Sequence, residues 1–256
     1  MTTLAAIDPQ NLFTVRFFWL KVDGLIVILS YLMGSIPFGY LIAKSRGIDI
    51  RQHGSGNIGA TNVMRVLGKK PGYMAFACDT LKGLVAVLVG KYIAQHHTLT
   101  FTQGHEMGGA IYHETYFVML PESIGAISAA VACIIGHNFP VWLGFKGGKG
   151  MATSGGVLMG MIWQSAATCM GLWVVVFYAT RYVSLASLAA SIALPLVTMI
   201  FLFFGVIHGW PYFYFTVAAC MLAVWRHRSN IVRLMNGTEN RFEKKGKGEL
   251  TTDEHG

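Results

Sequence analysis

The sequence has few charged residues for its length. Only 12% of its 256 residues are charged, whereas 54% are hydrophobic, and the mean hydropathy is +0.50. A soluble domain carries about 25% charged residues, so this composition excludes an ordinary soluble protein. The apolar residues fall in runs of about twenty, the length of a helix that crosses a bilayer. We therefore predict an all-α, polytopic membrane protein.

Several catalytic and metal-binding signatures are also missing. The four cysteines, Cys78, Cys133, Cys169 and Cys220, are dispersed and form no Cys-x-x-Cys pair, which argues against a disulfide framework or a zinc site. The sequence contains no Gly-x-Ser-x-Gly elbow, no His-Glu-x-x-His motif and no Walker A loop. It also lacks His-x-x-x-x-Asp, a signature of acyltransferases that use a His–Asp base. We expect no metal ion and no other cofactor.

The apolar runs predict one membrane domain. Spans are expected at about residues 22–43, 72–94, 122–143, 151–180, 183–206 and 210–225. The chain then consists of an N-terminal extension (1–21), a single transmembrane domain (22–240) and a polar tail (241–256). No internal repeat is evident, which argues against a transporter built from inverted repeats.

The distribution of Lys and Arg predicts the orientation. Both are concentrated in residues 44–70 and from Arg226 onward, whereas residues 95–121 contain neither. By the positive-inside rule, the two basic segments are cytoplasmic and residues 95–121 are external. The formal net charge of +8 therefore indicates topology and not a nucleic-acid partner.

Residues 151–180 decide the number of spans. This stretch is longer than an ordinary span of about 20 residues. If it forms a hairpin of two short helices that turns near Trp163-Gln164, the basic tail ends inside, as its charge requires. We therefore predict seven transmembrane helices, two of them short, with the N-terminus outside and the C-terminus inside. The alternative is six spans with an exposed basic tail.

Residues 54–62, Gly-Ser-Gly-Asn-Ile-Gly-Ala-Thr-Asn, form a polar segment between two apolar runs. Ser55 and Asn57 precede a helix that should start near Gly59, and the free N–H groups of a helix start can bind an anion. Glycine is costly unless the backbone must approach a ligand closely, an argument that applies to Gly54, Gly56 and Gly59.

The helix that follows carries cations. Thr61, Arg65 and Lys69 are spaced at i, i+4 and i+8, so we expect them to share one face. Arg65 could then bind a phosphate group in a bidentate manner. The alternative is an ordinary interfacial helix whose cations meet lipid headgroups.

A second polar segment, Gly144-Phe145-Lys146-Gly147-Gly148-Lys149-Gly150, follows the third predicted span. Successive N–H groups at Gly147 and Gly148 could form an anion-binding nest, and Lys149 would add a mobile positive charge. The alternative is a flexible loop whose lysine only sets the topology.

Some polar residues lie within or next to the predicted spans. Asp79 and Lys82, at i and i+3, are either functional or a structural ion pair, and the sequence leaves both open. His137 could donate to phosphate, although a hydrogen bond to a carbonyl is the slightly preferred interpretation. The hydroxyls of Ser184 and Ser187 more often bond their own helix than take part in chemistry.

The basic tail begins with a polar helical face. Arg226, His227, Asn230 and Arg233 share this face, and Gly237 should end the helix. Binding of anionic lipid headgroups is the simpler interpretation. A role in substrate binding requires the polar segments to converge.

Taken in order, these segments resemble the bacterial acyl-phosphate:glycerol-3-phosphate acyltransferase family. The resemblance covers about residues 30–240 and is most specific in its first two motifs. The matching residues are Gly34–Pro37, Gly47–Arg51 and Gly54–Asn62 with Arg65; Asp79–Gly83; Gly136–Pro140 and Phe145–Thr153; and Arg181–Ser187 with His227 and Asn230.

The resemblance implies an integral inner-membrane enzyme with seven helices and cytoplasmic motifs. Such an enzyme transfers an acyl group from acyl phosphate to glycerol 3-phosphate, giving lysophosphatidic acid (1-acyl-glycerol 3-phosphate) and inorganic phosphate. By position, Ser55, Arg65 and Lys149 would hold the acyl-phosphate headgroup and stabilise the transition state. Glycerol 3-phosphate would be placed by Asn57, His227 and Asn230.

Other residues of the matched segments are also candidates for substrate binding. They are Gly54, Gly56, Thr61, Asn62, Lys82, His137, Gly147, Gly148, Ser184 and Ser187. The expected partners are acyl phosphate, glycerol 3-phosphate and membrane lipids, with no nucleic acid; the oligomeric state is not predicted. The competing hypothesis is a membrane carrier for a phosphorylated solute, which should have ionisable groups near the bilayer midplane and internal symmetry.

Overall fold

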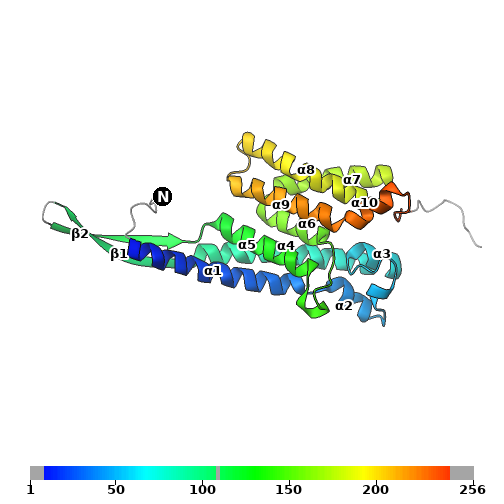
Figure 1. Ribbon diagram of the computed structural model, residues 1–256, viewed down its shortest axis with the longest axis horizontal. Helices are drawn as coiled ribbons and strands as arrows, with labels where there is room; N and C mark the ends of the chain where they lie inside the picture. Colours follow the sequence, from blue (N-terminus) through cyan, green and yellow to red (C-terminus); the bar gives the residue numbers. More distant parts are fainter. Residues whose placement is uncertain (1–8, 108–109, 243–256) are drawn as a thin grey trace, which may run out of the picture.

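The computed structural model describes residues 9–107 and 110–242 (Figure 1). Residues 1–8 of the predicted extension and 243–256 of the predicted tail lie outside that part. The described chain is a helical bundle with one β-hairpin. Its elements are α1 (Pro9–Ser35), α2 (Phe38–Lys44), η2 (Ile50–Gln52), α3 (Ala60–Leu67), α4 (Lys69–His96), β1 (Thr98–Met107), β2 (Ala110–Met119), α5 (Glu122–Asn138), η3 (Val141–Leu143), α6 (Met151–Met161), α7 (Trp163–Thr180), α8 (Val183–Phe203), α9 (Trp210–Arg226) and α10 (Arg228–Met235).

The predicted spans correspond to helices. Helices α4, α8 and α9 match their predicted runs closely. The first run is divided at Ile36-Pro37 into α1 and α2, and α1 begins at Pro9, earlier than predicted. A break is expected there because proline disfavours the helical conformation of the residue before it. Four described segments are long and apolar enough to cross a membrane: Asn11–Lys44, Lys69–His96, Glu122–Leu143 and Val183–Phe203.

The stretch 151–180 is divided into two short helices, as predicted. Helix α6 ends at Met161 and α7 begins at Trp163, so the break lies one residue before the predicted turn. Ile162, with φ −143° and ψ 66°, leaves the helical conformation. The start of α6 and the end of α7 lie at the same end of the molecule. Lys149, just before α6, donates to Asn230, and the carbonyl of Thr180 at the end of α7 accepts from Arg241. Asn230 and Arg241 belong to one segment near the end of the described chain.

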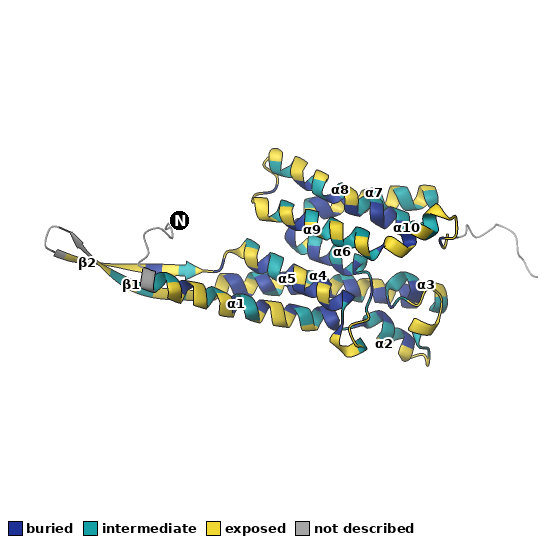
Figure 2. Ribbon diagram, viewed as in Figure 1, coloured by how far each residue is buried: buried dark blue, intermediate teal, exposed yellow. Residues whose placement is uncertain are grey.

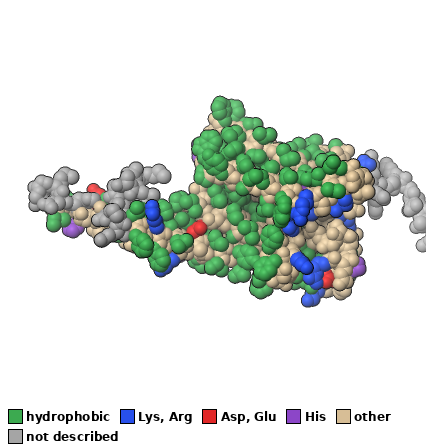
Figure 3. Space-filling view, viewed as in Figure 1, with side chains coloured by type: hydrophobic (Ala, Val, Ile, Leu, Met, Phe, Trp, Pro, Cys, Tyr) green, Lys and Arg blue, Asp and Glu red, His purple; other side chains and the backbone are tan. Residues whose placement is uncertain are grey.

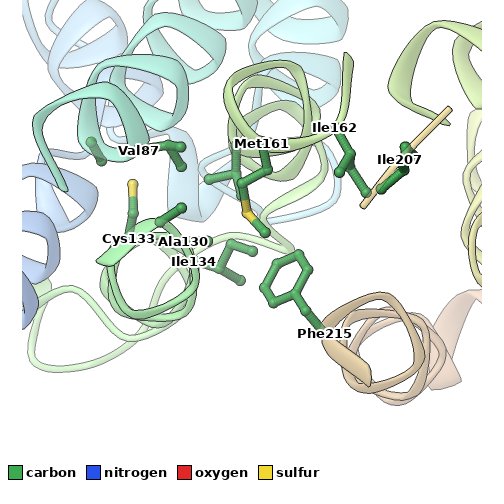
Figure 4. Packing of buried hydrophobic residues seen from close by; sticks show 11 residues of the cluster. Val87, Ala130, Cys133, Ile134, Met161, Ile162, Ile207 and Phe215 are labelled. Atoms are coloured by element: carbon green, nitrogen blue, oxygen red, sulfur yellow. The ribbon is translucent and has the colours of Figure 1, made fainter. Parts of the chain in front are cut away.

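The largest buried cluster joins α4 and α5 to α6 and α9 (Figure 4). Val87 of α4 and Ile134 of α5 face Met161 at the end of α6, and Phe215 of α9 closes the cluster. The outer faces are apolar and exposed over much of the bundle (Figure 2), as suits contact with lipid. The core therefore fixes α6, and with it the polar loop that precedes α6.

Glycine allows α4 and α6 to approach closely. A Cβ added to Gly83 would lie 2.2 Å from the carbonyl oxygen of Thr153, and one added to Gly156 would lie 1.8 Å from that of Thr80. Small residues at such contacts let helix backbones meet in a membrane. Gly83, the last residue of the matched segment Asp79–Gly83, is thus a packing residue.

The connection 95–121 differs from the all-α prediction. Strands β1 and β2 pair in antiparallel register from Thr98 opposite Met119 to Met107 opposite Ala110. The alternation Thr98-Leu99-Thr100-Phe101-Thr102 is typical of a strand, because Thr and aromatic residues favour a pleated conformation. Figure 1 places the hairpin at the end of the molecule opposite α2, α3 and α10.

Two neighbouring glycines of α6 allow a matched test of the α4–α6 contact. We expect Gly156→Ala to lower the thermal unfolding midpoint in detergent, because overpacking costs about 1–3 kcal/mol. Gly155→Ala is the control, since nothing lies within 4 Å of its added Cβ. Equal midpoints for the two variants would contradict the close contact.

Candidate functional site

Cationic side chains gather at the end of the molecule that carries α2, α3 and α10 (Figure 3). Three polar segments contribute them: residues 44–70, the loop 144–150 and the C-terminal segment from Arg226. The convergence that a substrate-binding role requires is therefore present for the groups described below. The middle of the same face is largely apolar.

The first polar loop is organised by Asn62. This buried side chain accepts from the N–H of Ser55 at 2.9 Å, and its Nδ2 lies within 2.9–3.2 Å of the carbonyls of Ile50, His53 and Asn57. The loop uses its amide donors and one lone pair of its oxygen, and a substrate role for Asn62 stays a prediction. Asn62 gives the loop its shape.

The glycines of this loop serve its conformation. Gly54 and Gly56 have φ of 60° and 67°, the left-handed region that glycine adopts without strain. A Cβ at Gly54 would also lie 2.3 Å from Oδ1 of Asn62. The turn itself, and not only a ligand, thus requires Gly54. Asn57 accepts from the N–H of Gly59 at 2.8 Å, which leads into α3.

Helix α3 begins at Ala60 with Gly59 as its N-cap, as predicted. It ends at Leu67, and Gly68, with φ 89°, separates it from α4. The expectation that Lys69 shares a face with Thr61 and Arg65 is therefore wrong, because Lys69 starts a different helix. No described residue accepts a hydrogen bond from Arg65.

The second polar loop does not form the predicted nest. The N–H groups of Gly147 and Gly148 donate to the carbonyls of Asn138 and His137, at 3.2 and 3.1 Å, and are unavailable to an anion. A Cβ at Gly148 would lie 2.1 Å from Nε2 of His137. The glycines therefore let the loop lie directly against the end of α5. The carbonyl of Gly148 in turn accepts from Arg226.

Asp79 and Lys82 form a buried ion pair below this loop. Nζ of Lys82 lies 2.8 Å from Asp79, donates to the carbonyl of Ile36 at 2.8 Å and lies 3.1 Å from Nδ1 of His137. His137 also contacts the hydroxyl of Thr153 at 3.2 Å. The structural interpretation of Asp79 and Lys82 thus holds, and direct substrate contact by Lys82 or the Nδ1 of His137 does not fit this geometry.

Lys149 projects from the loop into the cationic cluster. Its ammonium donates to Oδ1 of Asn230 on α10. The pKa of Lys149 is lowered to about 8, mainly by burial and also by the charges of Arg233, Arg226 and Arg65, whereas Glu239 acts in the opposite direction. Arg65 and Lys149 therefore share one electrostatic environment, although they come from distant segments of the chain.

His227 is neutral and presents a lone pair. Its pKa is lowered to about 4, mainly by burial and in part by the charge of Lys149, whereas the hydrogen bond to Ala223 acts in the opposite direction. Its Nδ1 lies 2.8 Å from the carbonyl of Ala223, so Nδ1 carries the proton and donates. Nε2 is then free to accept a hydrogen bond, for example from a substrate hydroxyl.

Glu239 was missed by the sequence analysis. Burial opposes its ionisation, but hydrogen bonds from Asn230 and Arg233, both at 2.7 Å, outweigh that effect and lower its pKa. Asn230 is thereby committed to Glu239 and Lys149. The available signal was weak: an acidic residue two positions after the predicted helix stop at Gly237. That stop is confirmed, since α10 ends at Met235 and Gly237 has φ 70°.

The remaining candidates occupy different positions. Ser184 is buried close to Glu239 at the edge of the cluster. Ser187 accepts from Nε1 of Trp173 at 3.1 Å within the α7–α8 contact, so its predicted role in substrate binding does not fit. Ser55 is exposed on the first loop, and Thr61 is half-buried on the first turn of α3. No described contact joins Ser55 to Lys149.

This arrangement suits the binding of anions. Arg65, Lys149 and Arg226 supply positive charge, and His227 supplies an acceptor beside them. The nearby carboxylate, Glu239, is held by hydrogen bonds and cannot readily act as a base. Such a site stabilises negative charge that develops on a bound group, in the manner of preorganised donors in acyl transfer.

Comparison with known proteins agrees with this chemistry. The family described as glycerol-3-phosphate acyltransferase matches residues 24–237. A glycerol-3-phosphate acyltransferase of Thermosynechococcus vestitus is 44% identical over 220 residues, covering 86% of this chain and 94% of that protein. One from Halalkalibacterium halodurans is 40% identical over 230 residues, covering 88% and 98%.

Solved structures lead to the same family. The glycerol 3-phosphate form of PlsY (YgiH), an integral membrane glycerol 3-phosphate acyltransferase, has a TM-score of 0.70 and 36% identity, covering 86% of this chain and 96% of that one. Its lysophosphatidic acid form has a TM-score of 0.68 at the same identity, covering 86% and 95%. With the match to residues 24–237, these likenesses establish that the chain belongs to the glycerol-3-phosphate acyltransferase family.

Proposed function

We propose that this membrane acyltransferase takes its acyl group from acyl phosphate and transfers it to glycerol 3-phosphate, giving lysophosphatidic acid and inorganic phosphate. The acceptor and product are supported by the two forms in which PlsY was solved. The donor is supported by the site, because an acyl phosphate brings a second anionic group that the clustered cations can bind. The observation that carries the proposal is the convergence of Arg65 and Lys149.

The chemistry asks little of a protein base. An acyl phosphate is a mixed anhydride with a good leaving group, so attack by the primary hydroxyl of glycerol 3-phosphate forms the ester as the bond to phosphate breaks. Negative charge grows on the carbonyl oxygen and on the departing phosphate, where Lys149 and Arg65 stabilise it. Ser55 is proposed as a further donor to the headgroup. A phosphate oxygen accepts the proton of the hydroxyl.

The acceptor is proposed to lie on the His227 side of the cluster. The free Nε2 of His227 accepts the hydrogen bond of the attacking hydroxyl and orients it. Asn230 places Lys149, and Asn57 stays a candidate for the acceptor's phosphate. Lys149 donates to Asn230, so we propose that this ammonium turns toward phosphate when the donor binds.

We further propose seven transmembrane helices with the N-terminus outside and the C-terminus inside, in the bacterial inner membrane. The division of 151–180 at Ile162 supports the count, and the cations around residues 44–70 and 226–241 support a cytoplasmic site. Residues 22–240 would form the transmembrane domain, with 1–21 and 241–256 as extensions. Membrane lipids are proposed to surround the exposed apolar faces.

The direct test uses purified protein in detergent with synthetic acyl phosphate. Release of inorganic phosphate that depends on added glycerol 3-phosphate, together with lysophosphatidic acid identified by mass, would support the proposal. Uptake of glycerol 3-phosphate into vesicles without phosphate release would favour the carrier hypothesis instead.

Two lysines of one loop provide a matched pair. We expect Lys149→Ala to lower kcat/KM about a hundredfold or more, because removing one preorganised donor to developing charge costs about 10²–10³ in rate. Lys146→Ala should change it less than about twofold, since Lys146 is exposed on the same loop. Similar losses in both variants would indicate that the loop acts only through its net charge.

Arg65→Ala should also lose most activity while the fold is retained. No described residue accepts a hydrogen bond from Arg65, and its side chain contacts the ring of Phe242, so its loss should remove phosphate binding and break no protein hydrogen bond. Activity and the thermal midpoint are measured on the same preparation. A wild-type rate in the Arg65→Ala protein would exclude the proposed role.

The pKa of Lys149 predicts a pH dependence. Because that pKa is lowered to about 8 in the free protein, the charged form is full below pH 7 and falls as pH rises through 8. We expect kcat/KM to fall above about pH 8, after correction for donor hydrolysis. Lys149→Arg, if active, should move this descending limb to higher pH, because arginine stays protonated. An unshifted limb would assign it to another group.

A further inference from the structure

The segment after α10 runs back across the cationic site. From Glu239, which is bonded to α10, the chain passes to the turn between α7 and α8. There Arg241 donates to the carbonyl of Thr180 at 3.2 Å, and the N–H of Phe242 donates to the carbonyl of Arg181 at 3.0 Å. Both Arg241 and Phe242 lie beyond the 24–237 match to the family.

The turn that anchors Phe242 has a strained conformation. Arg181 has φ 65°, a left-handed value that is unusual for a residue with a side chain. It directs its carbonyl to Phe242, whose ring lies edge-on to Phe177 with centroids 5.8 Å apart. Phe242 is therefore fixed by one backbone hydrogen bond to Arg181, just after α7, and by one aromatic contact with Phe177 on α7.

Arg65 also contacts this ring. Its guanidinium carbon is 5.5 Å from the centroid of Phe242, within the range of a cation–π contact. Stacking on a ring occupies the face of a guanidinium and leaves its N–H edge available. No described residue accepts from that edge, and the charges of Glu239 and Arg233 act on Arg65 nearby.

We propose that Phe242 is a positioning residue that holds the guanidinium of Arg65 over the site, with its donors directed to the phosphate of a substrate. Arg65 comes from α3 and Phe242 from the segment after α10, so the contact joins two distant parts of the chain. The proposal rests on the assigned role of Arg65 in the transferase reaction. It adds to that reaction a residue that lies beyond the 24–237 match to the family.

The test compares Phe242→Ala, Phe242→Leu and Phe242→Tyr in the phosphate-release assay. An exposed cation–π contact is worth about 0.5–1 kcal/mol, or about two- to fivefold in an equilibrium constant. We expect the Ala and Leu variants to raise KM for acyl phosphate, the substrate proposed to bind Arg65, by at least that factor. The Tyr variant should retain the wild-type KM. Phe203→Ala is the control, because Phe203 is 85% exposed and is the last residue of α8, at the end away from the turn that anchors Phe242.

A double-mutant cycle separates positioning from a general effect on folding. In an Arg65→Lys background with residual activity, Phe242→Ala should cause no further rise in KM, because the planar guanidinium is already gone. Additive effects, or a Leu variant equal to wild type, would overturn the proposal. An inactive wild-type protein would instead refute the transferase function itself, so the two failures are distinguishable.

Discussion

One buried carboxylate holds the cationic site together. Arg65, Lys149, Arg226 and Arg233 lie close enough for their charges to lower the pKa of Lys149. Their mutual repulsion would disperse them if no acidic group lay between. Glu239 is that group, and it binds Arg233 directly and Lys149 through Asn230. The site is thus arranged to keep its positive charge in place without neutralising it.

A second layer of the structure supports the loop that carries Lys149. The Asp79–Lys82 pair and His137 form a buried polar group that ties α4 to α5, and Gly148 lies directly on the imidazole. Polar groups at that depth are tolerated because they are paired. The loop therefore rests on a rigid base, and its Lys149 reaches Asn230 on α10.

Periodicity and charge predicted the helical architecture well because a bilayer restricts the chain so strongly. Apolar runs predicted the spans, and the excess of residues between 151 and 180 predicted the break near Trp163. The hairpin at residues 98–119 was missed because only its charge was considered, although its alternation of Thr with larger residues was present. Outside the hydrocarbon layer, composition restricts structure far less.

The candidate site was predicted less completely. The predicted cluster of Arg65, Lys149, His227 and Asn230 is present. Cationic side chains next to apolar runs are restricted to the membrane–water interface, which brings them together. Asn62, Gly147, Gly148, Lys82 and Ser187 were assigned to substrate but are used by the protein itself. A hydrogen-bonding residue in a motif looks the same whether its partner is a ligand or a carbonyl. Only the fold distinguishes the two.

The short length of α6 has a consequence for how the enzyme responds to its membrane. With 11 residues, the helix is about 16 Å long, roughly half the hydrocarbon thickness. A full span adjusts its tilt when the bilayer thickens or thins. Helix α6 instead takes its depth from backbone contact with α4, so the height of the reacting groups is set by protein against protein. A change in lipid chain length should therefore alter the depth of these groups less than it alters the tilt of the full spans.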